Sequence, residues 1–301
     1  MIVPAAESRR WLFVGASRFG LRCLEAMQRI QDIEVVGAVT APARFAISYR
    51  PQGVDNVLHA DVAAYCAARG IPSATLTRSM NDPGLYDRVA SWGPDAILVA
   101  GWYHMVPRKW RALAPAFGLH ASLLPDYSGG APLVWAMING EERTGITLFQ
   151  LADGVDDGPI VGQARTAIEP KDTIATLYAR IEELGIGLIE QHLPLLAQGR
   201  AKLTPQDDSR RRVVPQRSPE DGRIDWSQPA ARIADFVRAQ TRPYPGAFTL
   251  IEGRAFTLWR AHAAPQDGLA PGAHRRVQDT HHFGCGDGRI LVATDADWRD
   301  V

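Results

Sequence analysis

The sequence predicts an α/β protein built on a parallel sheet, followed by a smaller β-rich domain. Over roughly the first two thirds of the 301 residues, apolar strand-like runs alternate with segments of helical periodicity, and this order builds parallel sheets. Residues 202–226 are then polar and rich in helix and strand breakers, which indicates a linker. We therefore expect residues 1–203 to form the first domain, and residues 204–301 to hold the linker and the second domain.

The elements of the first domain follow from apolar patterns. WLFVGA at 11–16 and IEVVGAVTA at 33–41 read as strands, and the residues between them have helical spacing. DAILVAGW at 95–102 is apolar on both faces, as a buried parallel strand is. Further strands are expected at 117–124, 144–151 and 159–168, and helices at about 59–69, 83–92 and 173–199. The last of these helices is expected to be kinked or interrupted near Pro194.

The second domain is expected to contain one helix and several short strands. A helical pattern covers about 229–240, and the runs GAFTLIEG, RAFTLWRAHA and GRILVAT alternate with turn residues. Short strands at such spacing are typical of a small β-rich domain.

Composition excludes several classes of protein. Lys plus Arg and Asp plus Glu number 33 each, so a broad positive surface for nucleic acid is not expected. Cys23, Cys66 and Cys285 form no CxxC pair, which predicts neither a metal site nor a disulfide framework. The chain has no signal-peptide pattern and no apolar run of about 18 residues. We expect a cytoplasmic protein without membrane contact.

The first glycine-containing turn is FVGASRFG, with Gly15 and Gly20. It departs from the GxGxxG pattern that dinucleotide-binding proteins use. We interpret these glycines as parts of a tight turn between a strand and a helix.

The stretch FGLHASLLPDYSGGAPLVWAMING at 117–140 places His120 near the end of a predicted strand, ahead of a loop rich in Pro and Gly. Downstream, LADGVDDGPIVGQ at 151–163 carries Asp153, Asp156 and Asp157 in a second turn. A carboxylate can fix the tautomer of an imidazole and stabilise its charged form. A histidine and an aspartate on neighbouring strand ends thus form a candidate acid/base pair; the alternative is a histidine packed in the core.

Three segments resemble one family: HASLLPDYSGGAPLVWAMINGE at 120–141, TGITLFQLADGVDDGPIVGQ at 144–163, and SPEDGRIDW to RPYPGAF at 218–248. The chain resembles the N10-formyltetrahydrofolate-dependent formyltransferases. These include methionyl-tRNA formyltransferase, the sugar N-formyltransferases of surface polysaccharides, and glycinamide ribonucleotide transformylase. The resemblance implies a Rossmann-like catalytic domain, an OB-like second domain and N10-formyltetrahydrofolate as co-substrate, without a metal.

The resemblance also implies roles for single residues. The family pattern N-x-H-x-S-L-L-P with D-x-G-x-I assigns catalysis to His120 and Asp156, and the Asn of that pattern corresponds to Gly118. Ser128 is a second departure, since many members have Arg there. His120 would accept a proton from the attacking amine or donate to the oxyanion, and Asp156 would orient it. The family Asn is an oxyanion donor, so its absence requires a substitute.

Two outcomes follow for the missing amide. In the first, the missing amide is replaced by His104 or Tyr103 of GWYHMVP at 101–107, or by a water in the vacated space. In the second, the chain is a weak or non-catalytic homologue that binds folate or a sugar nucleotide. The residues that the resemblance assigns to the co-substrate are Trp102, Tyr103, His104, Met105, Leu123, Asp153, Gly154 and Val155. Those assigned to the acceptor are Ser122, Pro125, Tyr127 and Gly129.

The acceptor that we favour is the primary amine of a nucleotide-linked amino deoxysugar. The second domain argues against glycinamide ribonucleotide as acceptor, because the enzymes that use it resemble only the first domain. The zero net charge, together with Asp126 in the loop after His120, argues against tRNA. Transfer to tRNA remains the alternative. Trp135 also resembles the sugar enzymes. Arg217 and Arg242 are candidates for a diphosphate, or else ordinary surface and linker charges. A role in lipopolysaccharide biosynthesis and a homodimer are expected from the same resemblance.

Overall fold

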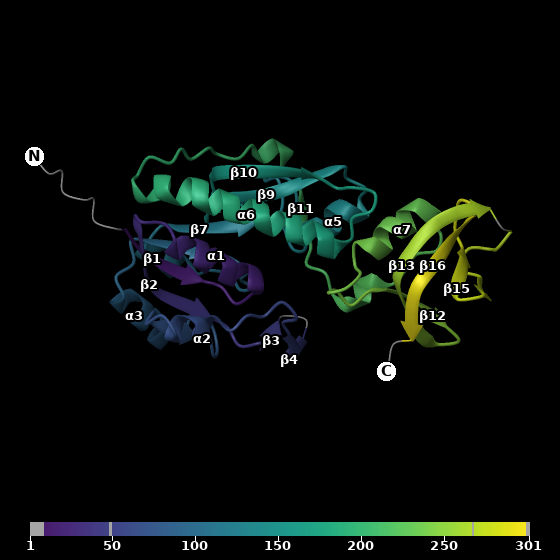
Figure 1. Ribbon diagram of the computed structural model, residues 1–301, viewed down its shortest axis with the longest axis horizontal. Coiled ribbons are helices and arrows are strands. Elements are labelled where there is room, and N and C mark those ends of the chain that lie inside the picture. The colour runs from purple at the N-terminus through teal and green to yellow at the C-terminus, as the bar shows by residue number, and fades with distance from the viewer. Residues whose placement is uncertain (1–8, 48–49, 267, 299–301) are drawn as a thin grey trace, which may run out of the picture. The chain divides into compact units, whose positions relative to one another are not determined.

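The computed structural model describes residues 9–47, 50–266 and 268–298, and it divides into two compact units (Figure 1). Unit 1 contains the described part of Met1–Ser128 together with Gly145–Arg165 and Glu182–Arg212. Unit 2 contains Gly129–Thr144, Thr166–Ile181 and the described part of Val213–Val301. This division differs from the single boundary expected after residue 203, because segments that are distant in sequence pack together in each unit.

A seven-stranded sheet forms the centre of unit 1, in the order β10-β9-β7-β6-β1-β2-β5. The strands β1 (Arg9–Val14), β2 (Ile33–Thr40), β5 (Ser73–Thr75), β6 (Ala96–Val99) and β7 (Ala116–His120) are parallel, while β9 (Arg143–Gln150) is antiparallel to β7. β10 (Ile160–Ala167) is the edge strand beside β9, and β3 (Arg44–Ile47) and β4 (Arg50–Asp55) form a separate hairpin. The predicted α/β fold with a largely parallel sheet is confirmed.

Helices cover both faces of this sheet, because alternate residues of its strands are buried on opposite sides. Leu12 and Val14 of β1 belong to one core cluster with residues of α3 (Pro83–Ser91) and α4 (Arg108–Leu113). On the opposite face lie α1 (Arg18–Gln28) and α6 (Ile174–Ala197), and α2 (Val62–Ala67) contacts β2 and β5. Arg22 of α1 forms ion pairs with Glu182 and Glu183 of α6 at 3.2 and 2.6 Å. The interruption expected at Pro194 does not occur, because α6 continues for three more residues.

Glycines allow two loops to meet where the strand order reverses beside β1. A Cβ atom on Gly15 would lie 2.3 Å from the carbonyl oxygen of Ala100, and one on Gly20 would lie 2.5 Å from the same oxygen. Gly101 has φ +60° and approaches Ser17 so closely that a side chain there would clash. The interpretation as a tight strand-to-helix turn is confirmed for Gly15, which lies between β1 and α1, whereas Gly20 lies in the first turn of α1.

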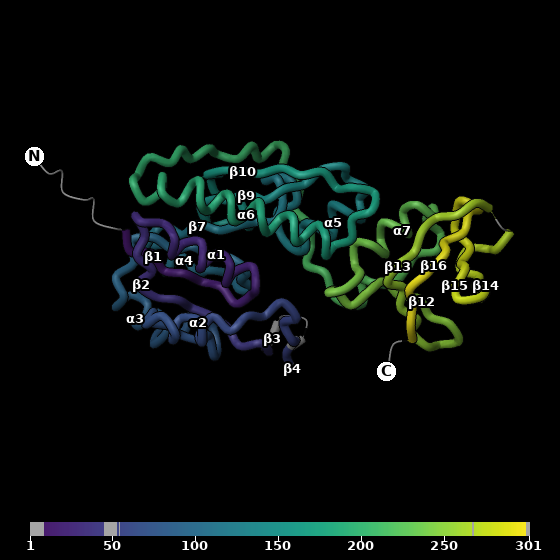
Figure 2. Tube along the Cα trace, viewed as in Figure 1, coloured from purple at the N-terminus to yellow at the C-terminus, as the bar shows by residue number. Residues whose placement is uncertain are grey.

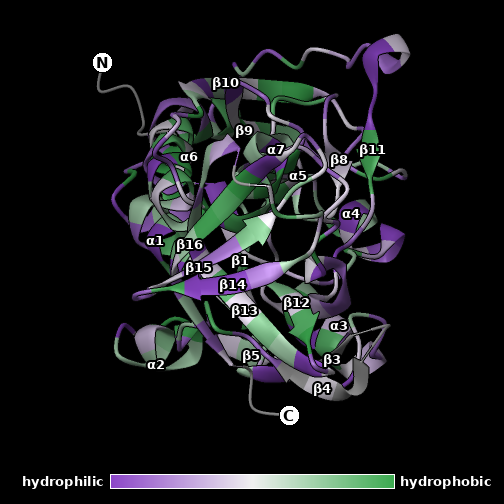
Figure 3. Ribbon diagram, turned by 90° about the vertical axis from the view of Figure 1, so that its right-hand side faces the viewer, coloured by the Kyte–Doolittle hydropathy of each residue, from purple (hydrophilic) through white to green (hydrophobic). Residues whose placement is uncertain are grey.

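Unit 2 contains the predicted β-rich domain. Its five-stranded sheet has the order β12-β13-β16-β15-β14, with antiparallel neighbours. The strands are β12 (Ala247–Ile251), β13 (Arg254–Gln266), β14 (His274–Val277), β15 (Thr280–Gly284) and β16 (Arg289–Trp298). Figure 3 shows a largely hydrophobic β16 inside the sheet and a hydrophilic β14 at its edge. Helix α7 (Ala230–Arg238) packs on β13 and contributes Ile233 and Val237 to the core.

The remaining elements are short. They are the helix α5 (Pro132–Ile138), the strands β8 (Ser128–Gly129) and β11 (Val213–Val214), and the 3₁₀ turns η1 (Asp208–Arg210) and η2 (Pro219–Gly222). The last three lie in the predicted linker, which is thus folded rather than extended. No helix among the described residues is long and apolar enough to cross a membrane.

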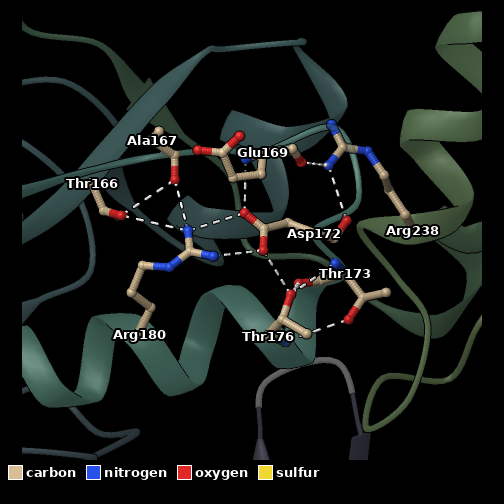
Figure 4. Close-up of polar contacts among 8 residues, drawn as sticks. All are labelled: Thr166, Ala167, Glu169, Asp172, Thr173, Thr176, Arg180 and Arg238. Carbon is tan, nitrogen blue, oxygen red and sulfur yellow. Dashed lines mark hydrogen bonds and ion pairs between the residues drawn. The ribbon is translucent and has the colours of Figure 1, made fainter.

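A buried carboxylate organises the start of α6 within unit 2 (Figure 4). Asp172 is 5% exposed and accepts hydrogen bonds from both Nη atoms of Arg180, at 2.7 and 3.0 Å. It also accepts from the amide of Glu169 at 2.8 Å and from the hydroxyl of Thr176 at 2.9 Å. Arg238 of α7 donates to the carbonyl oxygens of Glu169 and Asp172, both at 3.0 Å. This network connects the β10–α6 turn to α7.

The network controls the charge of Asp172. Burial by itself disfavours the carboxylate, but the hydrogen bonds from Arg180, Glu169 and Thr176 and the positive charge of Arg180 together hold the pKa of Asp172 below its ordinary value. A lowered carboxyl pKa means that the folded state favours the ionised form. The resulting stability is complete above the unfolded pKa of about 3.9 and is lost as the pH falls through the lower folded pKa.

We expect Asp172→Asn to lower the free energy of unfolding by about 2–3 kcal/mol near neutral pH, because Arg180 loses its charged partner. Chemical denaturation at pH 7 and at several values below pH 4 would measure this, with the exposed Asp87→Asn of α3 as control. The difference from wild type should shrink as the pH falls below about 4. An equal effect of the two substitutions at pH 7 would contradict the assignment.

Candidate active site

The structure brings together the two residues predicted to be catalytic. His120 ends β7, and its Nδ1 lies 3.5 Å from Oδ2 of Asp156. Its Nε2 lies 2.7 Å from the carbonyl oxygen of Tyr127. A carbonyl oxygen can only accept a hydrogen bond, so Nε2 carries a proton and donates it. Nδ1 is then the atom that can accept a further proton, and the carboxylate of Asp156 lies beside it to stabilise the resulting charge.

Asp156 reaches His120 from a loop and not from a neighbouring strand end. Because β9 is antiparallel to β7, the last residue of β9, Gln150, pairs with Phe117 near the start of β7. The expectation of adjacent strand ends was therefore wrong, since residues 151–159 must fold back toward His120. Asp156 has φ +52°, a left-handed conformation that costs a non-glycine residue about 1–3 kcal/mol and that the surroundings must maintain.

Several side chains hold this loop. Nε2 of Gln206 donates to the carbonyl oxygens of Asp156 and Gly158, at 2.8 and 2.7 Å. Arg211 donates to the carbonyl oxygen of Val155. Arg111 of α4 lies 2.7 Å from Asp153, and this hydrogen bond, together with the charges of Arg108 and Arg111, lowers the pKa of that carboxyl. The loop thus keeps a negative charge at Asp153 and a defined backbone at Asp156.

A second hydrogen-bond network shapes the loop after His120. The hydroxyl of Thr147, which is fully buried, donates to the carbonyl oxygen of Ser122 at 2.7 Å and accepts from the amide of Leu124 at 3.2 Å. Nε2 of Gln163 donates to the carbonyl oxygen of Leu124 at 2.8 Å, and Ser122 donates to that of Asp126 at 2.7 Å. These bonds end β7 at His120, so the strand predicted to reach residue 124 is four residues shorter.

The residues assigned to the acceptor build this loop. Ser122, Pro125 and Tyr127 are buried, and the guanidinium of Arg212 lies 4.3 Å from the centre of the Tyr127 ring. In unit 2, Gly129 has φ +103°, and a Cβ atom there would lie 2.3 Å from the carbonyl oxygen of Val214. Each residue thus has a structural role, while contact with an acceptor stays a prediction.

The position of the family Asn is surrounded by apolar groups. A Cβ atom on Gly118 would lie 2.9 Å from Cδ2 of Leu151 and 3.4 Å from the ring of Phe149. The three atoms nearest to a Cβ at this position are therefore all hydrocarbon. The replacement of the amide by a water, by His104 or by Tyr103 stays a prediction.

The loop at 101–107 starts level with that position, since Val99 at the end of β6 pairs with Gly118. The hydroxyl of Tyr103 donates to Oδ1 of Asn56 at 3.3 Å, and this side chain is 45% exposed. Met105 is 70% exposed. The loop thus presents apolar surface to solvent at the carboxyl end of β6, where open α/β sheets bind ligands.

Two further side chains of this loop, Trp102 and His104, are partly buried. Nε1 of Trp102 donates to the sulfur of Met80 at 3.2 Å, and the rings of Trp102 and His104 meet edge to face at 5.2 Å. Burial lowers the pKa of His104, so its imidazole is neutral at neutral pH and has one N–H donor. Of the two side chains expected to replace the amide, His104 is thus a neutral donor, and Tyr103 directs its hydroxyl to Asn56.

No sequence pattern indicated Gln206 and Arg212, which lie in a segment without periodicity. Thr147 and Gln163 do carry a signal, because a polar residue inside an apolar strand usually has a buried hydrogen-bond partner. Among the described residues, no group of three or more His, Cys, Asp or Glu is arranged to hold a metal ion.

The two arginines considered for a diphosphate make contacts within unit 2. The guanidinium of Arg217 lies 4.7 Å from the Trp135 ring and donates to Oε1 of Gln240 at 2.8 Å, and burial lowers its pKa. Arg242 lies 4.1 Å from the Trp259 ring and 3.1 Å from Asp295. Both side chains are held by neighbours, which favours their structural interpretation.

Comparison with solved structures finds similar folds at low sequence identity. HypX from Aquifex aeolicus, in complex with tetrahydrofolic acid, has a TM-score of 0.64 and 19% identity, and the match covers 98% of this chain but only 45% of that one. An N-formyltransferase from Helicobacter canadensis has a TM-score of 0.68 and 15% identity, over 95% of this chain and 98% of that one. Methionyl-tRNA formyltransferase from Clostridium thermocellum has a TM-score of 0.60 and 16% identity, over 97% and 100%. This chain thus spans less than half of HypX.

Models of protein families identify the family of this chain, which sequence identities of 15–19% to solved structures do not. The model described as formyl transferase matches residues 15–193, which include α1 through most of α6 and both residues of the His120–Asp156 pair. The model described as formyl transferase, C-terminal domain, matches residues 217–296 in unit 2. Together they match well over half of the sequence, and the chain belongs to the formyl transferase family.

Proposed function

We propose that this protein transfers a formyl group from N10-formyltetrahydrofolate to the primary amine of a nucleotide-linked amino deoxysugar. The observation that carries the proposal is the geometry of His120. Nε2 donates to the Tyr127 carbonyl oxygen at 2.7 Å, which leaves Nδ1 as the proton acceptor 3.5 Å from Asp156. Transfer of an acyl group to an amine requires such a base, because the amine must lose a proton.

The proton transfers follow from this geometry. As the amine nitrogen bonds to the formyl carbon, Nδ1 of His120 takes a proton from it, and Asp156 stabilises the imidazolium. When the bond between the formyl carbon and N10 breaks, His120 returns the proton to N10. The products are the formamide and tetrahydrofolate. A positioned general acid/base of this kind contributes roughly 10²–10⁴-fold to the rate.

The co-substrate is proposed to lie between the loops at 101–107 and 152–159. Exposed apolar side chains on both loops, Tyr103, Met105 and Val155, support this, since they offer apolar surface for an aromatic ligand. A structural neighbour, HypX, was solved with tetrahydrofolic acid.

The acceptor is proposed from charge and from one neighbour. The N-formyltransferase from Helicobacter canadensis was solved with folinic acid and dTDP-3-aminofucose, which supports a sugar nucleotide. Balanced charges, 33 of each sign, argue against a polyanion such as tRNA. The proposal extends to lipopolysaccharide biosynthesis in the cytoplasm and to a homodimer.

The oxyanion of the tetrahedral intermediate is proposed to be stabilised by His104. Three observations support it: the loop of His104 leaves the sheet level with Gly118, burial lowers the pKa of His104 and so favours its neutral form, and the atoms nearest to a Cβ on Gly118 are hydrocarbon. A neutral imidazole can donate one hydrogen bond to a developing anion without first losing a charge.

Incubation with N10-formyltetrahydrofolate and a panel of dTDP-, UDP- and GDP-linked 3-amino and 4-amino deoxysugars, with formyl-acceptor tRNA in parallel, tests the proposal by product mass. We expect a gain of one formyl group on a sugar nucleotide, and a loss of about 10²–10⁴-fold in kcat for His120→Ala and Asp156→Asn. Formylation of tRNA alone would replace the proposed acceptor. Folate binding with no turnover on any acceptor would favour a non-catalytic binding protein.

His104→Phe is expected to lower kcat by about 10²-fold, because it keeps an aromatic ring against Trp102 and removes the N–H donor. Tyr103→Phe is the matched control, since it removes the hydroxyl that donates to Asn56 from the same loop. Steady-state kinetics with the accepted sugar would measure both. Equal losses for the two variants would argue against an oxyanion contact by His104.

Gly118→Asn is expected to destabilise the fold by about 1–3 kcal/mol, because its side chain must displace Leu151. The combination with Leu151→Ala should recover part of this loss, since it removes the atom that the new Cβ would meet. Denaturation of the two single variants and the double variant would give the coupling. Additive effects would show that Leu151 is not the obstacle.

A further inference from the structure

The segment of residues 204–212, expected to be part of a linker, lies within unit 1 and runs beside β10 (Figure 2). We propose that this bracing segment positions both loops of the candidate active site, and that Gln206 is the positioning residue for Asp156. The proposal rests on the function proposed above. It assigns a catalytic consequence to residues that touch neither substrate nor reacting atoms.

The bracing segment first contacts the loop that carries Asp156. Thr204 exchanges two backbone hydrogen bonds with Ile160, at 2.8 and 2.7 Å, which fixes the segment to the first residue of β10. Two residues later, Nε2 of Gln206 reaches the carbonyl oxygens of Asp156 and Gly158. Arg211 reaches that of Val155. Backbone carbonyls on both sides of the catalytic carboxylate are thus bound by this segment.

The same segment then contacts the loop that follows His120. The amide of Arg212 donates to the carbonyl oxygen of Pro125 at 3.3 Å, and its own carbonyl oxygen accepts from the amide of Ser128 at 2.9 Å. Its guanidinium lies 3.1 Å from Asp126 and 4.3 Å from the centre of the Tyr127 ring. Tyr127 is the residue whose carbonyl oxygen fixes the tautomer of His120. One stretch of nine residues therefore contacts the partners of both catalytic side chains.

Gln206 has the most specific role in this arrangement. Both atoms that it meets are carbonyl oxygens, so only its amide nitrogen can face them. Among the described residues, no hydrogen-bond partner reaches its Oε1, which is buried. A buried acceptor without a partner is costly, so the two hydrogen bonds from Nε2 are what this side chain contributes. One of them is made to the carbonyl oxygen of Asp156 itself, the residue with φ +52° whose carboxylate lies beside His120.

Gln206→Leu removes both donors at similar volume and is the first test. The exposed Gln198→Leu is the matched control, because the Gln198 side chain donates to Asp32 and accepts from Arg200, and neither residue belongs to the two loops. We expect Gln206→Leu to lower kcat by ~10–100-fold while the KM for the co-substrate stays unchanged, since a carboxylate displaced by about 1 Å loses that much rate. Gln206→Lys restores N–H donors at similar length and should recover part of kcat. Gln206→Glu, which offers only acceptors when ionised, should not.

Hydrogen exchange followed by mass spectrometry gives a readout that does not depend on any acceptor. Amides of residues 152–159 should exchange faster in Gln206→Leu than in Gln198→Leu, with the rest of the sheet unchanged. Unchanged exchange in that loop would overturn the proposal, whether or not a substrate is found. An active wild type whose Gln206→Leu variant keeps its kcat would also overturn it and leave the proposed function intact. Faster exchange in a protein inactive on every acceptor would instead count against the proposed function alone.

Discussion

The hydrogen bond from Nε2 of His120 to the carbonyl oxygen of Tyr127 sets the chemistry of the candidate site. A histidine at the end of a strand can present either nitrogen, and the two tautomers have different reactivity. By placing a carbonyl oxygen 2.7 Å from Nε2, the fold leaves Nδ1 as the basic atom and directs it to the side of Asp156. The position of the Tyr127 carbonyl thus decides which ring nitrogen takes a proton.

That position depends on backbone conformations that few residues adopt without support. Tyr127 and Asp156 have φ values of +56° and +52°, and left-handed residues without glycine persist only when their surroundings hold them. For Tyr127 the support comes from the Thr147 and Gln163 network and from the guanidinium of Arg212. For Asp156 it comes from Gln206. The site therefore depends on buried and partly buried polar side chains whose hydrogen bonds are mostly made to backbone groups. Most side-chain hydrogen bonds in proteins are likewise made to backbone or water.

Gly118 gives the site a character of its own. Leu151 and Phe149 fill the space beside it, so the side of β7 that would hold an amide is apolar. Electrostatic interactions strengthen where water and polar groups are few, which increases the effect of each donor that remains near His120. Under the proposed mechanism, the stabilisation of the oxyanion then depends on the loop after β6 and not on the strand that carries the base.

The sequence by itself determined the alternation of strands and helices in the first domain, the approximate length of the long helix α6, and a histidine followed by a turn of three acids. The family resemblance then selected Asp156 among those acids. These features are encoded locally, in apolar periodicity and in residue types at fixed spacing. Only the tertiary structure decided that β9 is antiparallel to β7, that Leu151 fills the space beside Gly118, and that Ser122 and Tyr127 are buried. It also decided that a breaker-rich segment around Gln206 contacts both catalytic loops. The reason is physical: strand direction and the contacts of loops come from hydrogen bonds between backbone groups distant in sequence, and these leave no periodic pattern in the side chains.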